Sequence, residues 1–281
     1  MKINPRKVLS KVLLYGLLSV LAVPFFVPFW WMITASFKKP IDLFQFPPPL
    51  IPPYLEFANF TTAFSFQPFA RHYANSLYIA FTVTLGVLFI TSLAGYAFAR
   101  IKFKGSGFLF ILLLSALMMP SEVTIVPNFV FMDKLGFTDT HLPLLLLPIF
   151  GSGGIVSMFM MRQFFLSLPV ELEDAARMDG LGRFGIFLKI ALPIARPAMA
   201  AVAILTFLGA WNSFLEPFIF LNDLNLFTLP LSLRNFRDAY GSPLWTIQLA
   251  ATTMSVLPVL IFYIVAQKQV IESFSYSGVK G

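Results

Sequence analysis

The sequence predicts an all-α membrane protein with six transmembrane helices, and its composition is the first reason. Of its 281 residues, 58% are hydrophobic and only 12% are charged, and the mean hydropathy is +0.80. Soluble domains carry about 25% charged residues, so this chain has too few polar side chains to cover a water-exposed fold. The composition excludes a secreted enzyme, a disordered scaffold and a soluble nucleic-acid binder.

Long stretches without formal charge are the second reason, and they place the helices. A bilayer core of about 30 Å needs roughly 20 apolar residues in a helix. Five such runs lack Asp, Glu, Lys and Arg, and a sixth, from Phe108 to Met132, is interrupted only by Glu122. We expect one transmembrane domain over residues 1–281, with spans at about 12–37, 75–99, 108–131, 142–165, 197–221 and 245–267.

Prolines lie inside several of these runs and should bend the helices. They are Pro24 and Pro28 in the first span, Pro120 and Pro127 in the third, Pro143 and Pro148 in the fourth, and Pro258 in the sixth. Each removes a backbone donor that neighbouring helices must compensate. Bent helices suit a gated pathway, although proline is also simply commoner in membrane helices than in soluble ones.

The distribution of basic residues predicts that both termini are cytoplasmic. With the N-terminus inside, 14 of the 20 Lys and Arg residues fall in inner segments and six in outer segments. This bias follows the positive-inside rule. The first apolar stretch is too long for a cleaved signal peptide, so we interpret it as a retained anchor.

The residue types that usually carry catalysis or metal binding are scarce. The chain has no Cys, and its two His residues, His72 and His141, are far apart in the sequence. It has no phosphate-binding G-x-x-x-x-G-K-[ST] loop and no G-x-S-x-G elbow. We expect no metal, no bound cofactor and no enzymatic activity. The Gly151–Gly154 run, which lacks such a Lys, is expected to serve helix packing.

The segment 168–193, between the fourth and fifth spans, predicts two short helices with a break. Pro169 and the acidic residues that follow it suit a helix start, Glu173 and Arg177 are spaced to pair, and Gly180 can end the helix in a left-handed conformation. The second helix should bury one face and stop at Pro193; the face consists of Phe184, Phe187, Leu188 and Ala191. Small Ala175 and Ala176 would let a partner approach closely. The alternative is an amphipathic loop resting on the inner leaflet.

The spacing within this segment resembles the EAA loop of binding-protein-dependent ABC importer permeases. Asp174-Ala175-Ala176 is followed after three residues by Gly180, after nine more by Ile190, and after one more by Leu192-Pro193. Asp174 stands where that family usually has Glu, and neighbouring Glu173 offers a second carboxylate. The resemblance implies the type I ABC importer fold, with the helix that holds Asp174 to Gly180 as a coupling helix held by an ATPase. The coupling residues would be Glu173, Asp174, Ala175, Ala176, Arg177, Gly180, Ile190, Leu192 and Pro193.

Further segments resemble the carbohydrate-uptake branch, in particular its maltose-transporter-like second permease subunit. They are Leu93–Arg100, Met118–Pro127, Ala210–Pro217 and the terminal Gly278–Gly281. The resemblance implies a bacterial inner-membrane assembly of two different permeases, two ATPases that use ATP and Mg, and an external solute-binding protein. Besides these proteins we expect only membrane lipid as a partner, and no nucleic acid.

Polar residues inside the predicted spans are candidates for a solute pathway or gate. They are Glu122, Asn128, Trp211, Asn212 and Glu216. Helix rise places Glu122 and Asn212 at similar heights along the membrane normal, and burying either side chain against lipid would be energetically costly. Interhelical hydrogen bonding is the alternative for the polar residues, and core packing for Trp211.

Two other functions remain open from the sequence. Glycerol-phosphate or other polyol permeases look similar to this chain. A stand-alone secondary transporter would need a buried relay of ionisable groups, of which the spans offer only Glu122 and Glu216, and it would leave the segment 168–193 unexplained.

Overall fold

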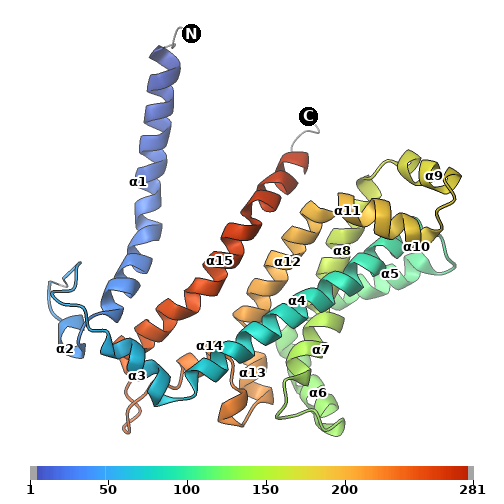
Figure 1. Cartoon of the computed structure of the whole chain (residues 1–281). Coiled ribbons are helices and arrows are strands. Elements are labelled where there is room, and N and C mark those ends of the chain that lie inside the picture. The colour runs from blue at the N-terminus through green and yellow to red at the C-terminus, as the bar shows by residue number, and fades with distance from the viewer. Residues whose placement is uncertain (1–4, 48, 278–281) are drawn as a thin grey trace. The chain divides into compact units, whose positions relative to one another are not determined.

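The computed structural model describes residues 5–47 and 49–277, and over these residues it is built from α-helices joined by short loops (Figure 1). The described residues contain no β-strand, only one isolated bridge between Arg237 and Pro243. The predicted all-α fold is confirmed. Lys2, Lys280 and the Gly278–Gly281 tail used in the sequence comparison lie outside the described residues.

Apolar helices long enough to cross a bilayer account for much of the described chain. Four pass this test, over Leu9–Ser36, Phe69–Arg100, Leu142–Ser167 and Trp245–Val265, and the number rises to six if each of two bent helix pairs is one span. The bent pairs are Ser106–Met118 with Glu122–Lys134, at 106°, and Arg183–Ile194 with Arg196–Trp211, at 75°. Six spans therefore require that each bent pair supplies one crossing of the membrane.

The chain divides into two compact units, of which the first comprises Met1–Phe69 and Leu233–Val256. It contains α1 (Pro5–Ser36), α2 (Pro40–Leu43) and α3 (Ala58–Phe66). The amide nitrogen of Asn59 donates to the carbonyl oxygens of Ser36 and Lys38, both at 2.8 Å. The buried Lys38 ammonium donates to the carbonyl of Pro49 at 2.5 Å. These bonds hold the proline-rich loop that follows α1 in a defined shape.

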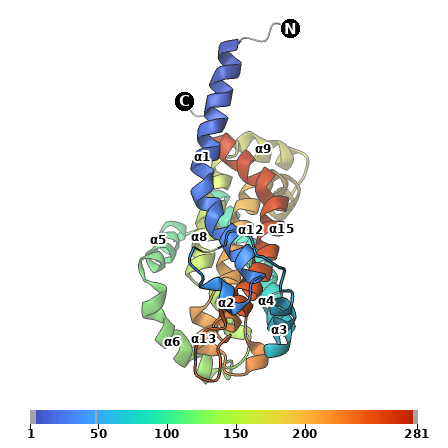
Figure 2. The same ribbon diagram turned by 90° about the vertical axis from the view of Figure 1, so that its left-hand side faces the viewer.

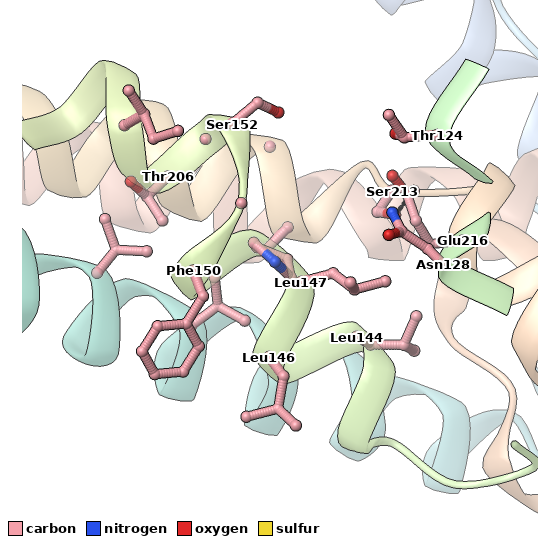
Figure 3. A pocket seen from close by; sticks show the side chains of 18 of the residues that line it. Thr124, Asn128, Leu144, Leu146, Leu147, Phe150, Ser152, Thr206, Ser213 and Glu216 are labelled. Atoms are coloured by element: carbon pink, nitrogen blue, oxygen red, sulfur yellow. Dashed lines mark hydrogen bonds between the residues drawn. The ribbon is translucent and has the colours of Figure 1, made fainter. Parts of the chain in front are cut away.

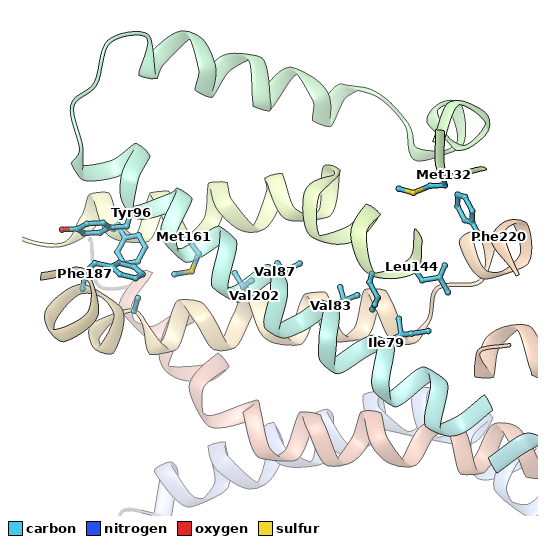
Figure 4. Packing of buried hydrophobic residues seen from close by; sticks show 14 of the residues in the cluster. Ile79, Val83, Val87, Tyr96, Met132, Leu144, Met161, Phe187, Val202 and Phe220 are labelled. Atoms are coloured by element: carbon cyan, nitrogen blue, oxygen red, sulfur yellow. The ribbon is translucent and has the colours of Figure 1, made fainter. Parts of the chain in front are cut away.

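The second unit, Ala70–Ser232 and Leu257–Gly281, holds the apolar core around α4 (Phe69–Arg100). Val83 and Val87 lie one turn apart on α4, and Figure 4 shows them near Val202 of α12 (Arg196–Trp211). Towards the end of α4, Tyr96 packs on Phe165 of α8 (Ser152–Ser167), with ring centroids 5.4 Å apart. The i, i+4 spacing of these apolar side chains is what commits one face of α4 to the core.

A close approach of α4 to α8 depends on Gly95. A Cβ at this position would lie 2.8 Å from the Cβ of Met161 and 2.9 Å from the backbone nitrogen of Arg162. Atoms at these distances overlap, so only glycine permits the contact. Small residues commonly allow such close helix packing in membranes.

The third predicted span is bent sharply at its centre. Helix α5 (Ser106–Ser115) continues through the short η1 (Ala116–Met118) and gives way at Pro120 to α6 (Ser121–Lys134). Figure 2 shows α5 and α6 as a bent arm at the edge of the second unit. Pro120 was expected to disturb this helix, and it is the residue at which the second half begins.

The fourth and fifth predicted spans are also interrupted. Helix α7 (Leu142–Phe150) is separated from α8 by Gly151, and α12 ends at Trp211, before the short α13 (Leu215–Phe220). At about 1.5 Å per residue, the 16 residues of α12 are too short for a bilayer core of about 30 Å. The expected single helix over 197–221 is therefore two helices with a break at residues 212–214.

Both histidines fasten the segment that follows α13, which carries η3 (Leu224–Leu226) and α14 (Leu229–Leu233). The Nε2 of His72 contacts the carbonyl oxygen of Leu224 at 2.7 Å, and its Nδ1 lies 2.8 Å from the hydroxyl of Ser232. Because a carbonyl only accepts, Nε2 of His72 carries the proton. His141 contacts the carbonyl of Leu226 at 2.8 Å. The last helix, α15, runs over Trp245–Ser277.

Candidate functional site

The segment 168–193 forms a short exposed helix followed by a packed one. Pro169 precedes α9 (Val170–Met178), whose first turn carries Glu171 and Glu173. Gly180 ends it with a φ of +83°, the left-handed conformation expected for this residue. Figure 1 shows α9 and the following α10 (Arg183–Ile186) and α11 (Leu192–Ile194) gathered at one end of the second unit.

The acidic residues of α9 occupy two different environments. Glu173 is buried, and its Oε1 lies 3.2 Å from Nε of Arg100, the last residue of α4. Asp174 is exposed, and its Oδ1 lies 2.9 Å from Nη1 of Arg177. The predicted i, i+4 pair between Glu173 and Arg177 is confirmed at 3.5 Å. Glu173 was expected to support Asp174 at a partner surface, but the structure turns it towards α4, so of these two carboxylates only Asp174 faces outwards.

The two alanines also differ from the expected contact surface. Ala175 is exposed, whereas Ala176 is buried against the chain itself. They are adjacent on a helix and therefore point about 100° apart, so one side of α9 can pack while the other stays free. Further along, Ile190 and Leu192 are half-buried and Pro193 is exposed.

The second helix of the segment buries a different face from the predicted one. Phe187 and Ala191 are buried as expected, but Phe184 is 66% exposed and Leu188 44% exposed. Residues Phe187–Ala191 form a π-helical stretch. A π-helix closes its hydrogen bonds five residues apart, so the 3.6-residue period used for the prediction fails here.

An exposed apolar side chain on α9 escaped the sequence reasoning. Met178, at the end of the helix, is 89% exposed. Val170 and Leu172 in its first turn are also exposed. The only sequence signal for this exposed apolar surface is that α9, a nine-residue helix rich in charged residues, also contains large apolar residues. Exposed apolar side chains rimmed by charges are typical of protein contact sites.

A cavity of about 1040 Å³ lies in the second unit, at the two helix interruptions. Its lining includes Gly151, between α7 and α8, and Ser213, between α12 and α13, while α6 supplies a further wall. Figure 3 shows Asn128, Ser213 and Glu216 on one side of it. The hydroxyl of Ser213 donates to the Glu216 carboxylate at 2.6 Å. Irregular backbone at membrane depth is tolerated where it lines a cavity.

Of the expected pathway residues, only Asn128 and Glu216 line this cavity. Glu122 and Asn212 are exposed and are not in its lining. The height estimate assumed two straight helices, whereas α6 is bent by 106° from the preceding segment and α12 ends before Asn212. The structure therefore does not bring Glu122 or Asn212 to this cavity.

Trp211 belongs to the core. It is only 3% exposed, stacks on Phe207 with centroids 5.8 Å apart, and meets Tyr73 edge-on at 5.9 Å. A ring so enclosed has no free face for a sugar. The packing alternative is confirmed for this residue.

Within the described residues, no group of three or more His, Asp or Glu side chains is placed to hold a metal ion. The described residues combine an all-helical fold, four to six helices long and apolar enough to cross a membrane, interrupted helices around a cavity and an exposed amphipathic helix. This combination is typical of a polytopic membrane transport component.

Comparison with known proteins identifies the family. Residues 86–270 match the binding-protein-dependent transport system inner membrane component family, and the chain belongs to it. It is 36% identical to the arabinooligosaccharides transport system permease protein AraQ of Halalkalibacterium halodurans over 100% of both chains. It is 31% identical to the trehalose/maltose transport system permease protein MalG of Thermococcus litoralis, covering 98% of this chain and 99% of that protein.

A solved structure agrees in fold. A chain of a bacterial ABC transporter that imports the acidic polysaccharide alginate superposes with a TM-score of 0.80 at 21% identity, covering 95% of this chain and 99% of that one. The chain is therefore a multi-pass inner-membrane permease component of an ABC importer. Such a component works with a binding protein and ATPase subunits.

Proposed function

We propose that this chain is one of two different permease subunits of an ABC importer and forms half of the pathway for a sugar or oligosaccharide. Both termini and the segment 168–193 would face the cytoplasm, as the basic residues suggest. One of the two ATPase subunits of the importer would bind α9 there, and a solute-binding protein would deliver the solute on the other side. The names of the relatives AraQ and MalG support the assignment to carbohydrate.

The observation that carries the proposal is the exposed surface of α9. It presents an acidic residue, Asp174, beside the small Ala175 and the apolar Met178, on a helix ended by Gly180. A groove on an ATPase could bury the methionine and pair a cation with the aspartate. The helical segment that follows α10 would then support α9; it contains Ile190, Leu192 and Pro193.

The lining of the cavity favours a neutral sugar over a glycerol phosphate. Its polar side chains include Thr124, Asn128, Ser213 and Glu216, and its described lining contains no Lys, Arg or His. Hydroxyl and amide groups can hydrogen-bond to a polyol. A phosphate there would find no counter-charge and would be repelled by Glu216.

The same lining argues against a stand-alone secondary transporter. Glu216 is the single formally charged side chain among the described residues that line the cavity. Ion-coupled transport usually needs several interacting ionisable groups at membrane depth. ATP and Mg would be used by the partner ATPase, and this chain itself would bind no cofactor and catalyse no hydrolysis, because its sequence contains no phosphate-binding loop.

Reconstitution tests this proposal. The chain would be purified in complex with its second permease and ATPases, and proteoliposomes would be supplied with its binding protein and either maltose, an arabino-oligosaccharide or glycerol 3-phosphate. We expect ATP-dependent uptake of a neutral sugar and none when the ATPases are omitted. ATP turnover by the purified chain alone, or uptake driven by an ion gradient without ATP, would contradict the proposal.

A further inference from the structure

Arg100, the last residue of α4, contacts both α9 and the residue that precedes Pro169 at its start. Its Nε lies 3.2 Å from Oε1 of Glu173, and its Nη2 donates to the carbonyl oxygen of Leu168. The Nε–Oε1 contact is an ion pair without the alignment of a hydrogen bond. The hydrogen bond to Leu168 therefore fixes the guanidinium, and its charge holds the carboxylate of α9.

Both members of this pair are shielded from water. The side chains of Arg100 and Glu173 are only 10% and 6% exposed. Separating them would leave the buried Arg100 guanidinium without its counter-charge and Glu173 with only the half-exposed Arg177, which is more costly than losing a surface pair. A buried pair of this kind fixes the relative position of two elements even where its net contribution to stability is small.

The last turn of α4 also holds the second helix of the segment. Tyr96, one turn before Arg100, packs on Phe187 with ring centroids 5.2 Å apart. The backbone on either side of α9 is irregular, since Pro169 is extended and Gly180 is left-handed. Side-chain contacts with α4, more than the chain connections, therefore set the position of α9.

We propose that Arg100 is the positioning residue that carries movement of α9 into the second span, α4. The inference rests on the proposed docking of α9 on an ATPase. It assigns different tasks to the two acidic residues: Asp174 belongs to the docking surface, and Glu173 with Arg100 transmits the motion. Loss of the buried pair should uncouple ATP hydrolysis from transport without preventing docking.

The test uses the full importer in proteoliposomes, with Arg100→Met and Glu173→Gln as single variants. We expect both to co-purify with the ATPases as the wild type does, while solute transported per ATP falls by about tenfold, because α9 loses its buried charge contact with α4. Arg162→Met is the matched control. Arg162 of α8 donates to the carbonyl of Phe98 on α4 at 3.2 Å and lies over the ring of Phe110 on α5, so it is anchored to α4 and α5 and its loss should leave this ratio unchanged.

A distance measurement separates transmission from a general loss of structure. Spin labels would be placed on cysteines replacing Met178 on α9 and Phe89 on α4, both exposed, in this naturally Cys-free chain. We expect the distance between the labels to stay constant through the ATP cycle in the wild type and to change with nucleotide in Arg100→Met. The double variant Arg100→Glu with Glu173→Arg reverses the two charges and should reduce the change in label distance caused by nucleotide.

Two results would overturn the inference. One is an unchanged ratio of solute to ATP in Arg100→Met and Glu173→Gln. The other is a label distance that varies with nucleotide in the wild type as much as in the variants. Failure of the proposed function would look different, because ATPase recruitment would then be insensitive to Asp174→Lys. Arg100→Lys retains the charge, so it tests the ion pair if Arg100→Met does not fold.

Discussion

Asp174 and Arg177 form an exposed ion pair on α9, with 2.9 Å between Oδ1 and Nη1 and side chains that are 60% and 52% exposed. A pair this exposed contributes little to folding, so its carboxylate is free to exchange Arg177 for a cation of a partner. Asp174→Lys should therefore leave the fold intact and weaken ATPase recruitment by about tenfold or more through like-charge repulsion. Co-purification of the ATPase measures this effect.

Asp174→Glu is the control for that variant. It keeps the charge and adds one methylene, and it restores the residue that is usual in the resembling loop. We expect recruitment and uptake close to those of the wild type. Equal recruitment of the ATPase by the Lys and Glu variants would show that the ATPase does not bind the surface around Asp174.

The break between α7 and α8 provides a test of the fold. A Cβ on Gly151 would lie 2.4 Å from the carbonyl oxygen of Leu147, and a Cβ on Gly154 2.3 Å from that of Ile149. Gly151→Ala and Gly154→Ala should each lower the free energy of unfolding by about 1–3 kcal/mol, because the backbone must shift. Thermal unfolding in detergent checks this expectation.

Gly153 is the matched control in the same run. A Cβ there would meet its nearest neighbour, the carbonyl oxygen of Pro148, at 3.6 Å, which is ordinary contact. Gly153→Ala should therefore change Tm little. Equal losses for all three variants would mean that the break does not depend on these close approaches.

Substitutions of Trp211 distinguish a packing role from a role in sugar recognition. Because its ring is enclosed by Phe207 and Tyr73, Trp211→Ala should cost about 3–5 kcal/mol of stability. Trp211→Phe should retain most of the stability and leave the affinity for the solute unchanged. A Phe variant that folds normally but has lost solute affinity would restore the stacking hypothesis.

Local sequence signals predicted the start and end of α9 correctly, because they depend on neighbouring residues alone. Pro169 and Gly180 act through their own backbone preferences, and the Glu173–Arg177 spacing is fixed by one helical turn. The membership of the family was likewise evident from the spacing of Asp174, Gly180 and Pro193, which the family match supports.

The errors arose where tertiary contacts or helix irregularities decide. Leu188 lies in the π-helical stretch Phe187–Ala191, where the 3.6-residue period does not hold, and it is exposed together with Phe184 of the preceding α10. Glu173 is drawn inwards by Arg100, which lies 73 positions earlier in the chain and could not be paired with it from spacing. The heights estimated for Glu122 and Asn212 assumed unbroken helices, whereas the structure bends the first of these spans by 106° and ends α12 at Trp211.

Asp139 gives the structure a pH-dependent contact outside the long apolar helices. Its Oδ1 accepts backbone hydrogen bonds from Asp223 at 2.9 Å and Asn222 at 2.8 Å, and these bonds lower its pKa. The contribution of the Asp139 carboxylate to the stability of the fold is complete above the unfolded pKa of about 3.9. It is lost as the pH falls through the lower pKa that Asp139 has in the folded protein. The wild type should therefore exceed Asp139→Asn in Tm at pH 6, and the difference should shrink below about pH 4.

A Tm difference between the two proteins that is the same at pH 6 and pH 3.5 would contradict this role for the Asp139 carboxylate. The comparison with Asn removes the effects of other titrating groups, because both proteins share them. The test needs only purified chain in detergent.

The central claim is that α9 docks on an ATPase, and proximity labelling at Met178 tests it most directly. A photoreactive maleimide on Met178→Cys, in an otherwise Cys-free chain, should cross-link to the ATPase in the assembled importer. The same label on Tyr240→Cys, which is equally exposed but lies in the first unit on the proposed outer side, should not. Cross-linking from position 240 and none from position 178 would contradict the account.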